Sequence, residues 1–232
     1  MQEIRIYTAV HNAIYDKGHL LASISNARLF DEFCKIFIGG MGEQNFIKLC
    51  SFGLNKYLIS SDPNKNDFSN SIMIKALRNT DERIKNDQSV TPGFLMAALL
   101  WPILISKCSK DGEVNIRKFF RSMDGVLREQ QKLTAIPRKF NSYIKDIWVL
   151  QLKLHSRIKS QPYKTIRHPR FRAAYDFLLV REQASGDKNG LGKWWTDFQK
   201  NDDSLRGSLI SSMNEKSDEE SSKIFGFFKE LR

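Results

Sequence analysis

Cysteine is scarce in this sequence, and the few that occur argue against a disulfide framework or a cysteine metal site. The three residues, Cys34, Cys50 and Cys108, are odd in number and too widely spaced for a zinc knuckle. The four histidines form no metal or catalytic-triad pattern with them. The composition therefore predicts free thiols in a reducing cytoplasm.

Long apolar runs are also lacking. The longest run covers residues 94–105 and has Pro102 inside it, whereas a membrane-spanning helix needs roughly twenty apolar residues. The first ten residues, MQEIRIYTAV, include the acidic Glu3 and lead into no long apolar core, so neither a secretory signal nor a transit peptide is predicted. We expect a cytoplasmic protein without a membrane partner.

Basic residues outnumber acidic residues, and the excess is concentrated in one part of the chain. The 232 residues carry 37 Lys and Arg against 26 Asp and Glu, a net charge of +11. Residues 117–172 alone carry fifteen Lys and Arg against Asp124, Glu129 and Asp146, a net charge of +12. Such a concentration predicts an anionic partner, either nucleic acid or an acidic surface. Aromatic residues are interleaved with these charges; they could stack on bases, or they could belong to the core.

Strand-like alternation is absent, so the predicted fold class is all-α. Apolar residues recur at three- and four-residue spacings, which is typical of amphipathic helices. Thr91 followed by Pro92 is a helix-start signal. Helices are predicted over residues 24–38, 43–58 (as one or two), 71–83, 91–104, 116–133, 138–158 and 168–181, with a last turn or two from residue 193. The chain divides into helical regions at 1–60, 61–135 and 136–200, followed by a polar, mobile tail at 201–232 in which Phe225, Phe227 and Phe228 form a short docking segment.

Residues 166–181, IRHPRFRAAYDFLLVR, hold four arginines, a histidine and three aromatics. Arg167, Arg170 and Arg181 are predicted phosphate contacts, because the planar guanidinium matches phosphate geometry. Arg172 and Asp176 are four residues apart on a predicted helix, so Arg172 either pairs with Asp176 or contacts the anionic partner. His168, before a proline, is expected to cap or pack. The Trp194–Trp195 pair is expected to anchor a helix in the core more readily than to stack on bases.

Three blocks resemble the bacterial poly(A) polymerases, class II nucleotidyltransferases related to the tRNA nucleotidyltransferases. They are SNARLFDEFCKIF (25–37), LRNTDERIKNDQSVTPGFLMAALLWPIL (77–104), and IPRKFNSYIKDIWVLQLKL (136–154) leading to HPRFRAAYDFLLVR (168–181). With the helices between them, the resemblance covers about residues 20–200. It implies a catalytic head followed by helical neck, body and leg regions that guide ATP and the RNA 3′ end, and the three helical regions above resemble the latter three. RNA is the partner that the resemblance implies.

The candidate RNA-binding residues lie in the leg-like region and at its borders. They are Arg138, Lys139, Lys145, Lys153, Arg157, Arg167, Arg170, Arg172 and Arg181.

The catalytic signature of the family is missing from these 232 residues. A head of this family shows a Gly-Ser pair and then an Asp-x-Asp pair that holds two metal ions, and no Asp-x-Asp occurs here. The nearest substitutes, Asp111 with Glu113 and Asp218 with Glu220, do not follow a strand. The resemblance implies ATP and Mg²⁺ for the full-length family, but we expect no catalytic residue and no cofactor in this chain alone.

The resulting hypothesis is an RNA-holding portion of a poly(A) polymerase, either half of a split gene or a truncated form, that binds RNA weakly and does not polymerise alone. One alternative is a helical subunit on which a separate head polypeptide docks, which exposed apolar residues on the helix at 24–37 would favour. The other alternative is a protein-interaction module in an RNA-degradation or RNA-chaperone complex.

Overall fold

The computed structural model describes residues 2–60, 68–109, 116–157, 159–186 and 190–214, and within these ranges every regular element is helical. This confirms the all-α prediction. The elements are α1 (Gln2–Lys17), η1 (Gly18–Ser23), α2 (Asn26–Phe37), α3 (Gly42–Ser51), η2 (Asn55–Tyr57), α4 (Phe68–Lys85), α5 (Pro92–Ser109), α6 (Ile116–Gln131), α7 (Arg138–His155), α8 (Gln161–Ile166), α9 (Phe171–Ser185), α10 (Leu191–Lys200) and α11 (Asp203–Asn214).

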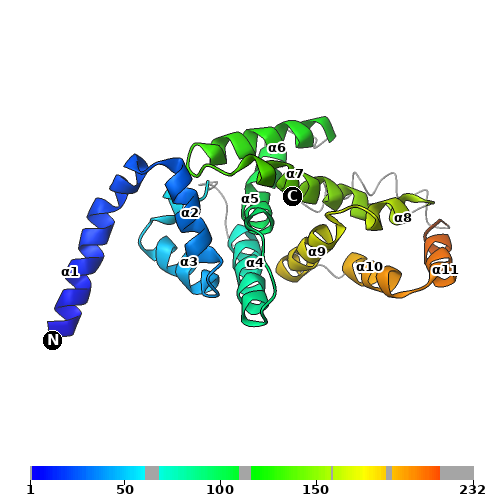
Figure 1. Cartoon of the computed structure of the whole chain (residues 1–232), viewed down its shortest axis with the longest axis horizontal. Helices are drawn as coiled ribbons and strands as arrows, with labels where there is room; N and C mark the ends of the chain where they lie inside the picture. The colour runs from blue at the N-terminus through cyan, green and yellow to red at the C-terminus, as the bar shows by residue number, and fades with distance from the viewer. Residues whose placement is uncertain (1, 61–67, 110–115, 158, 187–189, 215–232) are drawn as a thin grey trace.

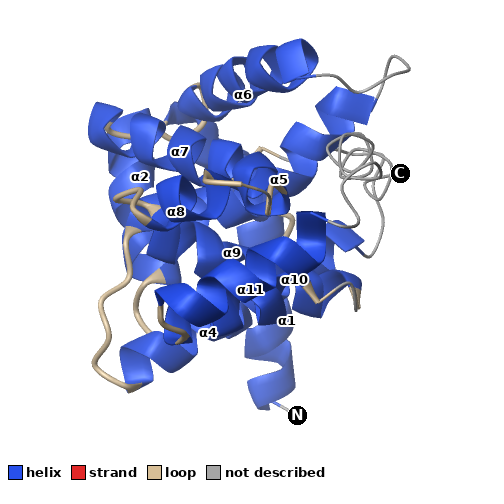
Figure 2. Cartoon of the chain, turned by 90° about the vertical axis from the view of Figure 1, so that its right-hand side faces the viewer, coloured by secondary structure: helices blue, strands red, loops and turns tan. Residues whose placement is uncertain are grey.

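The helices are spread along the long axis of the molecule, with α4 and α5 at its centre and α6 and α7 across the top (Figure 1). At one end α1 projects away from the remainder, and at the other end lie α10 and α11. Turned by 90°, the molecule shows α6 above α7, with α10 and α11 facing the viewer (Figure 2). The division into neck-, body- and leg-like regions remains a prediction.

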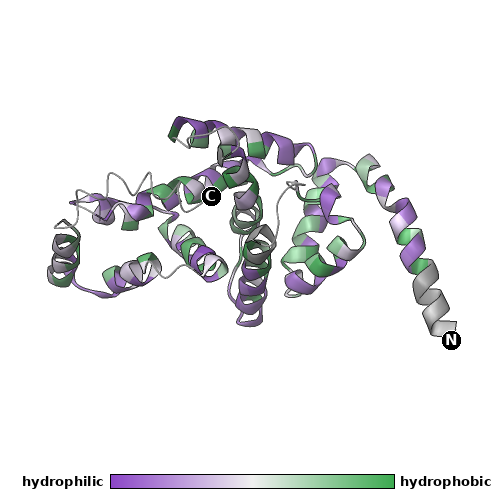
Figure 3. Cartoon of the chain, turned by 180° about the vertical axis from the view of Figure 1, so that it is seen from behind, coloured by the Kyte–Doolittle hydropathy of each residue, from purple (hydrophilic) through white to green (hydrophobic). Residues whose placement is uncertain are grey.

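The first and larger core surrounds α5. Every side chain from Phe94 to Ile105 is buried, as expected for a helix that is apolar on all sides. Against α5 pack α4, α6, α7 and α9, and the colouring by hydropathy shows this central helix as largely hydrophobic (Figure 3). The Trp148 indole on α7 donates a hydrogen bond to the Ala97 carbonyl at 2.9 Å, which ties α7 to α5.

A second core joins α7, α9, α10 and α11. Trp195 is fully buried there and donates to the Leu154 carbonyl at 2.9 Å, while Trp194 stacks on Phe198 at 5.0 Å between ring centroids. The prediction that this tryptophan pair anchors a helix in the core is confirmed.

Side-chain oxygens cap several helix starts. The Thr91 hydroxyl accepts from the Phe94 amide at 3.4 Å, which confirms the predicted start of α5. At the start of α3 the cap comes from another helix: the buried Asp81 of α4 accepts from the Gly42 and Glu43 amides at 2.7 and 3.0 Å. A carboxylate at this position also favours the positive end of the helix dipole. These bonds fix α3 against α4.

Polar contacts join the N-terminal helices to the end of α6. Buried Gln130 accepts from the Ser60 amide at 2.8 Å and donates to the Leu58 carbonyl at 2.8 Å. The Asn26 amide donates to the carbonyls of Gln131 and Lys132 at 3.2 and 3.0 Å. Residues 26–60 therefore do not stand apart from the larger core.

Several segments differ from the sequence prediction. Helices α1 (Gln2–Lys17) and α8 (Gln161–Ile166) were not predicted. Residues 168–181 are predicted as one helix, but α9 begins only at Phe171. Pro169 disfavours the helical conformation at His168, and the cap residue Arg170 has a non-helical backbone at φ −102° and ψ 8°. A mobile tail is predicted from residue 201, but α11 occupies residues 203–214: Ile210 is buried on the second core and Arg206 donates to the Phe198 carbonyl at 2.8 Å. The Phe225, Phe227 and Phe228 segment lies outside the described residues.

None of the helices in the described ranges combines the length and the apolar character that a membrane span requires.

Candidate nucleic-acid interface

The turn between α8 and α9, residues 167–170, is the centre of the basic surface. The Arg170 guanidinium lies over the Tyr143 ring of α7, 4.6 Å from its centroid, a cation–π contact that orients the arginine. His168 Nδ1 accepts from the Arg170 amide at 3.1 Å, so His168 caps the turn as predicted. The turn therefore presents Arg167 and Arg170 from a fixed backbone.

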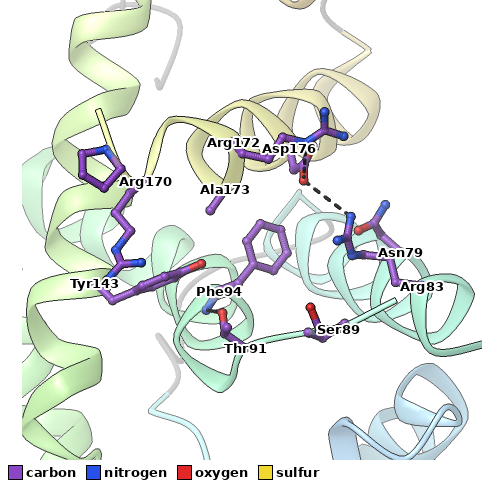
Figure 4. Close-up of a pocket in the computed structure, with 12 residues that line it drawn as sticks. Asn79, Arg83, Ser89, Thr91, Phe94, Tyr143, Arg170, Arg172, Ala173 and Asp176 are labelled. Atoms are coloured by element: carbon purple, nitrogen blue, oxygen red, sulfur yellow. Dashed lines mark hydrogen bonds and ion pairs between the residues drawn. The ribbon is translucent and has the colours of Figure 1, made fainter. Parts of the chain in front are cut away.

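A pocket of about 220 Å³, here called the α4–α9 pocket, opens beside this turn. The residues that matter for its chemistry are Asn79 and Arg83 of α4, Tyr143 of α7, and Arg170, Arg172 and Asp176 at the turn and on α9. Figure 4 shows Arg170 lying along Tyr143 on one side and Arg172, Asp176 and Arg83 grouped on the other. Three arginines against one aspartate give the pocket a positive charge.

Asp176 pairs with two of these arginines. Its carboxylate lies 3.1 Å from Arg172 Nε and 3.5 Å from Arg83 Nη1. The pair predicted from the four-residue spacing is therefore present, although Arg172 remains 73% exposed at its side chain. Such a pair contributes little to stability at this exposure, so Arg172 can still contact an anion. The sequence did not predict Arg83, which comes from a helix distant in the chain.

A second pocket of about 210 Å³, here called the α6–α7 pocket, has His168 of the same turn in its wall. Its wall includes Phe120 of α6 and Lys145 and Lys153 of α7. Lys145 pairs with Asp124 at 2.5 Å, and Phe120 is 43% exposed while its neighbour Phe119 is buried. Of the aromatics interleaved with the basic residues, Phe120 is thus placed where a base could stack.

Three candidate residues, Arg138, Lys139 and Arg167, are exposed and form no ion pair with another described residue. Lys153 is exposed too. Lys139 lies 5.0 Å from the centroid of the neighbouring Phe140 ring. Exposed cations of this kind can contact the phosphate groups of a nucleic acid.

Arg157 and Arg181 lie differently, in the packing between the two cores. Arg181 donates to Gln151 Oε1 at 3.0 Å and lies 4.7 Å from the Trp101 ring centroid. Arg157 lies 5.8 Å from the Trp194 ring centroid. Both are half-buried, so they are less open to solvent than Arg138, Lys139 and Arg167. Their predicted contact with RNA stays a prediction.

No group of three His, Cys, Asp or Glu residues that could hold a metal ion occurs within the part of the chain that the structure describes. Asp111, Glu113, Asp218 and Glu220 lie outside that part. The three cysteines are free, and burial raises the pKa of each thiol.

The apolar side chains of α2, Leu29, Phe33 and Phe37, are buried. The exposed apolar face that would favour a head polypeptide docking on this helix is therefore not found there. Exposed apolar side chains lie instead on the neighbouring elements; they are Val10, Tyr15, Leu20, Met41 and Ile47.

Two family models match this chain. One, described as "Polymerase A arginine-rich C-terminus", matches residues 111–224. This range includes the residues of α7, of α9 and of the 167–170 turn that line the two pockets. The other, described as "Probable RNA and SrmB- binding site of polymerase A", matches residues 4–63. All of the predicted RNA contacts lie in the first of these two regions.

The chain is similar to curated proteins named Poly(A) polymerase I. The protein from Escherichia coli is 35% identical over 191 residues, which are 78% of this chain and 41% of the relative. The proteins from Haemophilus influenzae and Salmonella typhimurium are 33% and 34% identical, over 85% and 78% of this chain and 46% and 41% of the relatives. This chain thus spans less than half the length of the relatives that it matches.

Proposed function

Because this chain belongs to the bacterial poly(A) polymerase family, we propose that it binds single-stranded RNA on the surface formed by α7, α8 and α9. The observation that carries the proposal is the set of exposed, unpaired cations Arg138, Lys139 and Arg167 next to Arg170, whose guanidinium is oriented by Tyr143. They lie in the region matched by the arginine-rich family model.

The surface is suited to a strand of several nucleotides. Lys139 and Lys153 on α7 are separated by about 21 Å at the rise of an α-helix, and the 167–170 turn lies between the two pockets. Arginine forks contact the phosphates, and Phe120 and Tyr143 supply ring faces. Small single-strand-binding domains occupy roughly 4–16 nucleotides in the same way.

In this proposal the chain binds RNA and does not catalyse the transfer of adenylate. The printed sequence contains no Asp-x-Asp pair, and the described residues offer no metal site. The ATP-dependent tailing implied by the relatives' name is proposed for an assembly in which other residues supply the catalytic head, and the cytoplasm is the proposed location.

Replacing Lys139, Arg167 and Arg170 together by alanine is expected to weaken RNA binding at least tenfold without unfolding the chain. Each lost phosphate contact also removes about 0.7 from the slope of log affinity against log salt for a single strand, so the slope should fall by about 2. Filter binding of a labelled RNA over a salt series measures both quantities, and circular dichroism checks the fold.

The control replaces Lys85, Lys193 and Lys200, which are also exposed and of which Lys193 pairs with Asp197 at 2.7 Å. The control changes net charge by the same amount, and we expect a much smaller effect from it. Equal losses in the two triple variants would show that binding follows net charge alone and would contradict the proposed surface.

A second candidate function is a protein contact through residues 4–63. The family match there names a protein as well as RNA, and exposed Val10, Tyr15 and Leu20 provide apolar area. We expect the chain to bind immobilised SrmB, the protein named in that family description, even with excess oligonucleotide RNA present. Changing Tyr15 and Leu20 to glutamate should weaken this retention. Complete release by RNA would identify the contact as RNA-mediated and remove the protein role.

A further inference from the structure

Two of the three arginines in the α4–α9 pocket share a single carboxylate. Asp176 of α9 lies 3.1 Å from Arg172 Nε and 3.5 Å from Arg83 Nη1, and Figure 4 shows both arginines grouped with this side chain. The Asp176 side chain is 16% exposed, whereas the side chains of Arg83 and Arg172 are 32% and 73% exposed. The carboxylate is therefore the inner member of the group, and the two guanidinium groups are the more open to solvent.

Asp176 does not use all the hydrogen-bond donors of the two arginines. Each guanidinium has five N–H donors in a planar fork, and the contacts to Asp176 come from Nε of Arg172 and Nη1 of Arg83. The separation from Arg83 also exceeds the roughly 2.7–2.9 Å of a charge-assisted hydrogen bond. Both arginines thus keep donors for a second anion, and two positive charges against one negative charge leave the group able to attract it.

A phosphate group of a nucleic-acid strand matches these donors, because a guanidinium binds phosphate through parallel hydrogen bonds. The pocket volume of about 220 Å³ is below the roughly 300–1,000 Å³ of sites for drug-sized molecules, so it suits a phosphate better than a whole nucleotide. Pro169 and Arg170 of the 167–170 turn line the same pocket. A strand bound at the turn can therefore place a neighbouring phosphate there.

We propose that the α4–α9 pocket binds one phosphate of the RNA strand through Arg83 and Arg172, and that Asp176 limits the strength of this contact. This rests on the proposed RNA binding and extends its surface to α4. Arg83 lies between the ranges 4–63 and 111–224 that the two family models match. In the free chain Asp176 reduces the repulsion between the two arginines. When the phosphate is bound, the same carboxylate repels it.

The site predicts that the loss of one carboxylate tightens RNA binding. Asp176→Asn keeps the shape of the side chain and an oxygen acceptor for the arginines but removes the negative charge. The full 232-residue chain with this change should bind a labelled single-stranded RNA at least about threefold more tightly at about 0.1 M salt, because a charge so close to the phosphate is only partly screened. The slope of log affinity against log salt should also steepen, by up to about 0.7. Fluorescence anisotropy over a salt series measures both quantities.

Two controls separate the pocket from net charge. Asp197 of α10 also pairs with a cation four residues away, Lys193 at 2.7 Å. Asp197→Asn makes the same change in net charge and should raise the affinity much less. In a chain that already carries Arg83→Gln and Arg172→Gln, Asp176→Asn should give no gain, because the phosphate has lost its contacts.

Arg83→Gln in the otherwise unmodified chain tests the same site independently of Asp176. If Arg83 only ties α4 to α9, its loss lowers the melting temperature and leaves the salt slope unchanged. A phosphate contact instead requires the slope to fall by about 0.7, the contribution of one phosphate in a single strand. Circular dichroism gives the melting temperature. If Asp176→Asn does not fold, the salt slope of Arg83→Gln decides.

The outcomes distinguish this proposal from the proposed function. No gain in folded Asp176→Asn, or an equal gain in Asp197→Asn or in the chain without the two arginines, would overturn the phosphate site and leave RNA binding intact. Inorganic phosphate in place of chloride, at equal ionic strength, tests for a free ligand. If it raises the melting temperature of Asp176→Asn more than that of Asp197→Asn, without the gain in RNA affinity, the site belongs to free phosphate and the assignment to RNA is overturned. Failure of the unmodified chain to bind any RNA would overturn the proposed function as well.

Discussion

Replacing Trp101 by alanine is expected to lower the free energy of unfolding by about 3–5 kcal/mol, the usual loss for a large aromatic residue removed from a core. Trp101 has no exposed surface. Its ring packs edge-on against Phe119 of α6 at 6.3 Å and Phe177 of α9 at 5.4 Å between centroids. Removing it leaves a cavity at the junction of three helices. Denaturant unfolding followed by circular dichroism measures the change.

Two variants show whether the loss comes from this packing. Trp101→Phe keeps a ring at the junction and should lose clearly less than Trp101→Ala. Tyr15→Ala removes a ring that is 68% exposed and should change stability by no more than about 0.5 kcal/mol. A Trp101→Ala variant as stable as Tyr15→Ala would contradict the central place of α5 in the core.

The Trp101 variant also bears on the basic surface, because the Arg181 guanidinium lies over the same ring. The sequence predicted Arg181 as a phosphate contact from its place in the arginine-rich segment. The structure adds a packing role that depends on Gln151, thirty residues earlier in the chain, and on Trp101 of α5. Contacts between residues so far apart leave no local signal, so this role could not be predicted from spacing.

The sequence predicted well those parts of the fold that depend on residues close together in the chain. The start of α5 was predicted from Thr91 and Pro92. The break between the helices predicted at 24–38 and 43–58 is found between α2 and α3. In contrast, α11 was missed because its polar composition outweighed four apolar residues at helical spacing, Leu205, Leu209, Ile210 and Met213, of which Ile210 is buried only through contact with another helix.

The candidate site was predicted in part. The 167–170 turn, the Arg172–Asp176 pair and the capping role of His168 were accessible from sequence, since each depends on neighbours within a few residues. Asn79 and Arg83 were not, although both stand in the block at 77–104 that resembles the family. They reach the pocket only because α4 packs against α9.

Lowering the pH from 7.5 to 5.0 is expected to cost the folded chain about 2 kcal/mol of stability through His155 alone. Burial, and then the charges of Arg181 and Arg157, lower the pKa of the His155 imidazole from 6.5 to about 3. Below pH 6.5 the unfolded chain takes up a proton that the folded chain does not take up until about pH 3. Stability is therefore complete above pH 6.5 and is lost progressively as the pH falls toward 3.

The measurement is the difference in pH dependence between variants. Between pH 7.5 and 5.0 the free energy of unfolding of His155→Gln should depend less on pH than that of the unmodified chain, because the contribution of the His155 imidazole is gone. This holds whatever the absolute stability of the variant. His19→Gln removes an exposed imidazole and should keep the slope of the unmodified chain. Identical slopes for His155→Gln and the unmodified chain would show that the folded protein protonates His155 normally. A neutral His155 allows Arg157 and Arg181 to approach the same region without a third positive charge, so the loss of stability at low pH follows first from the burial of His155 and then from the two arginine charges beside it.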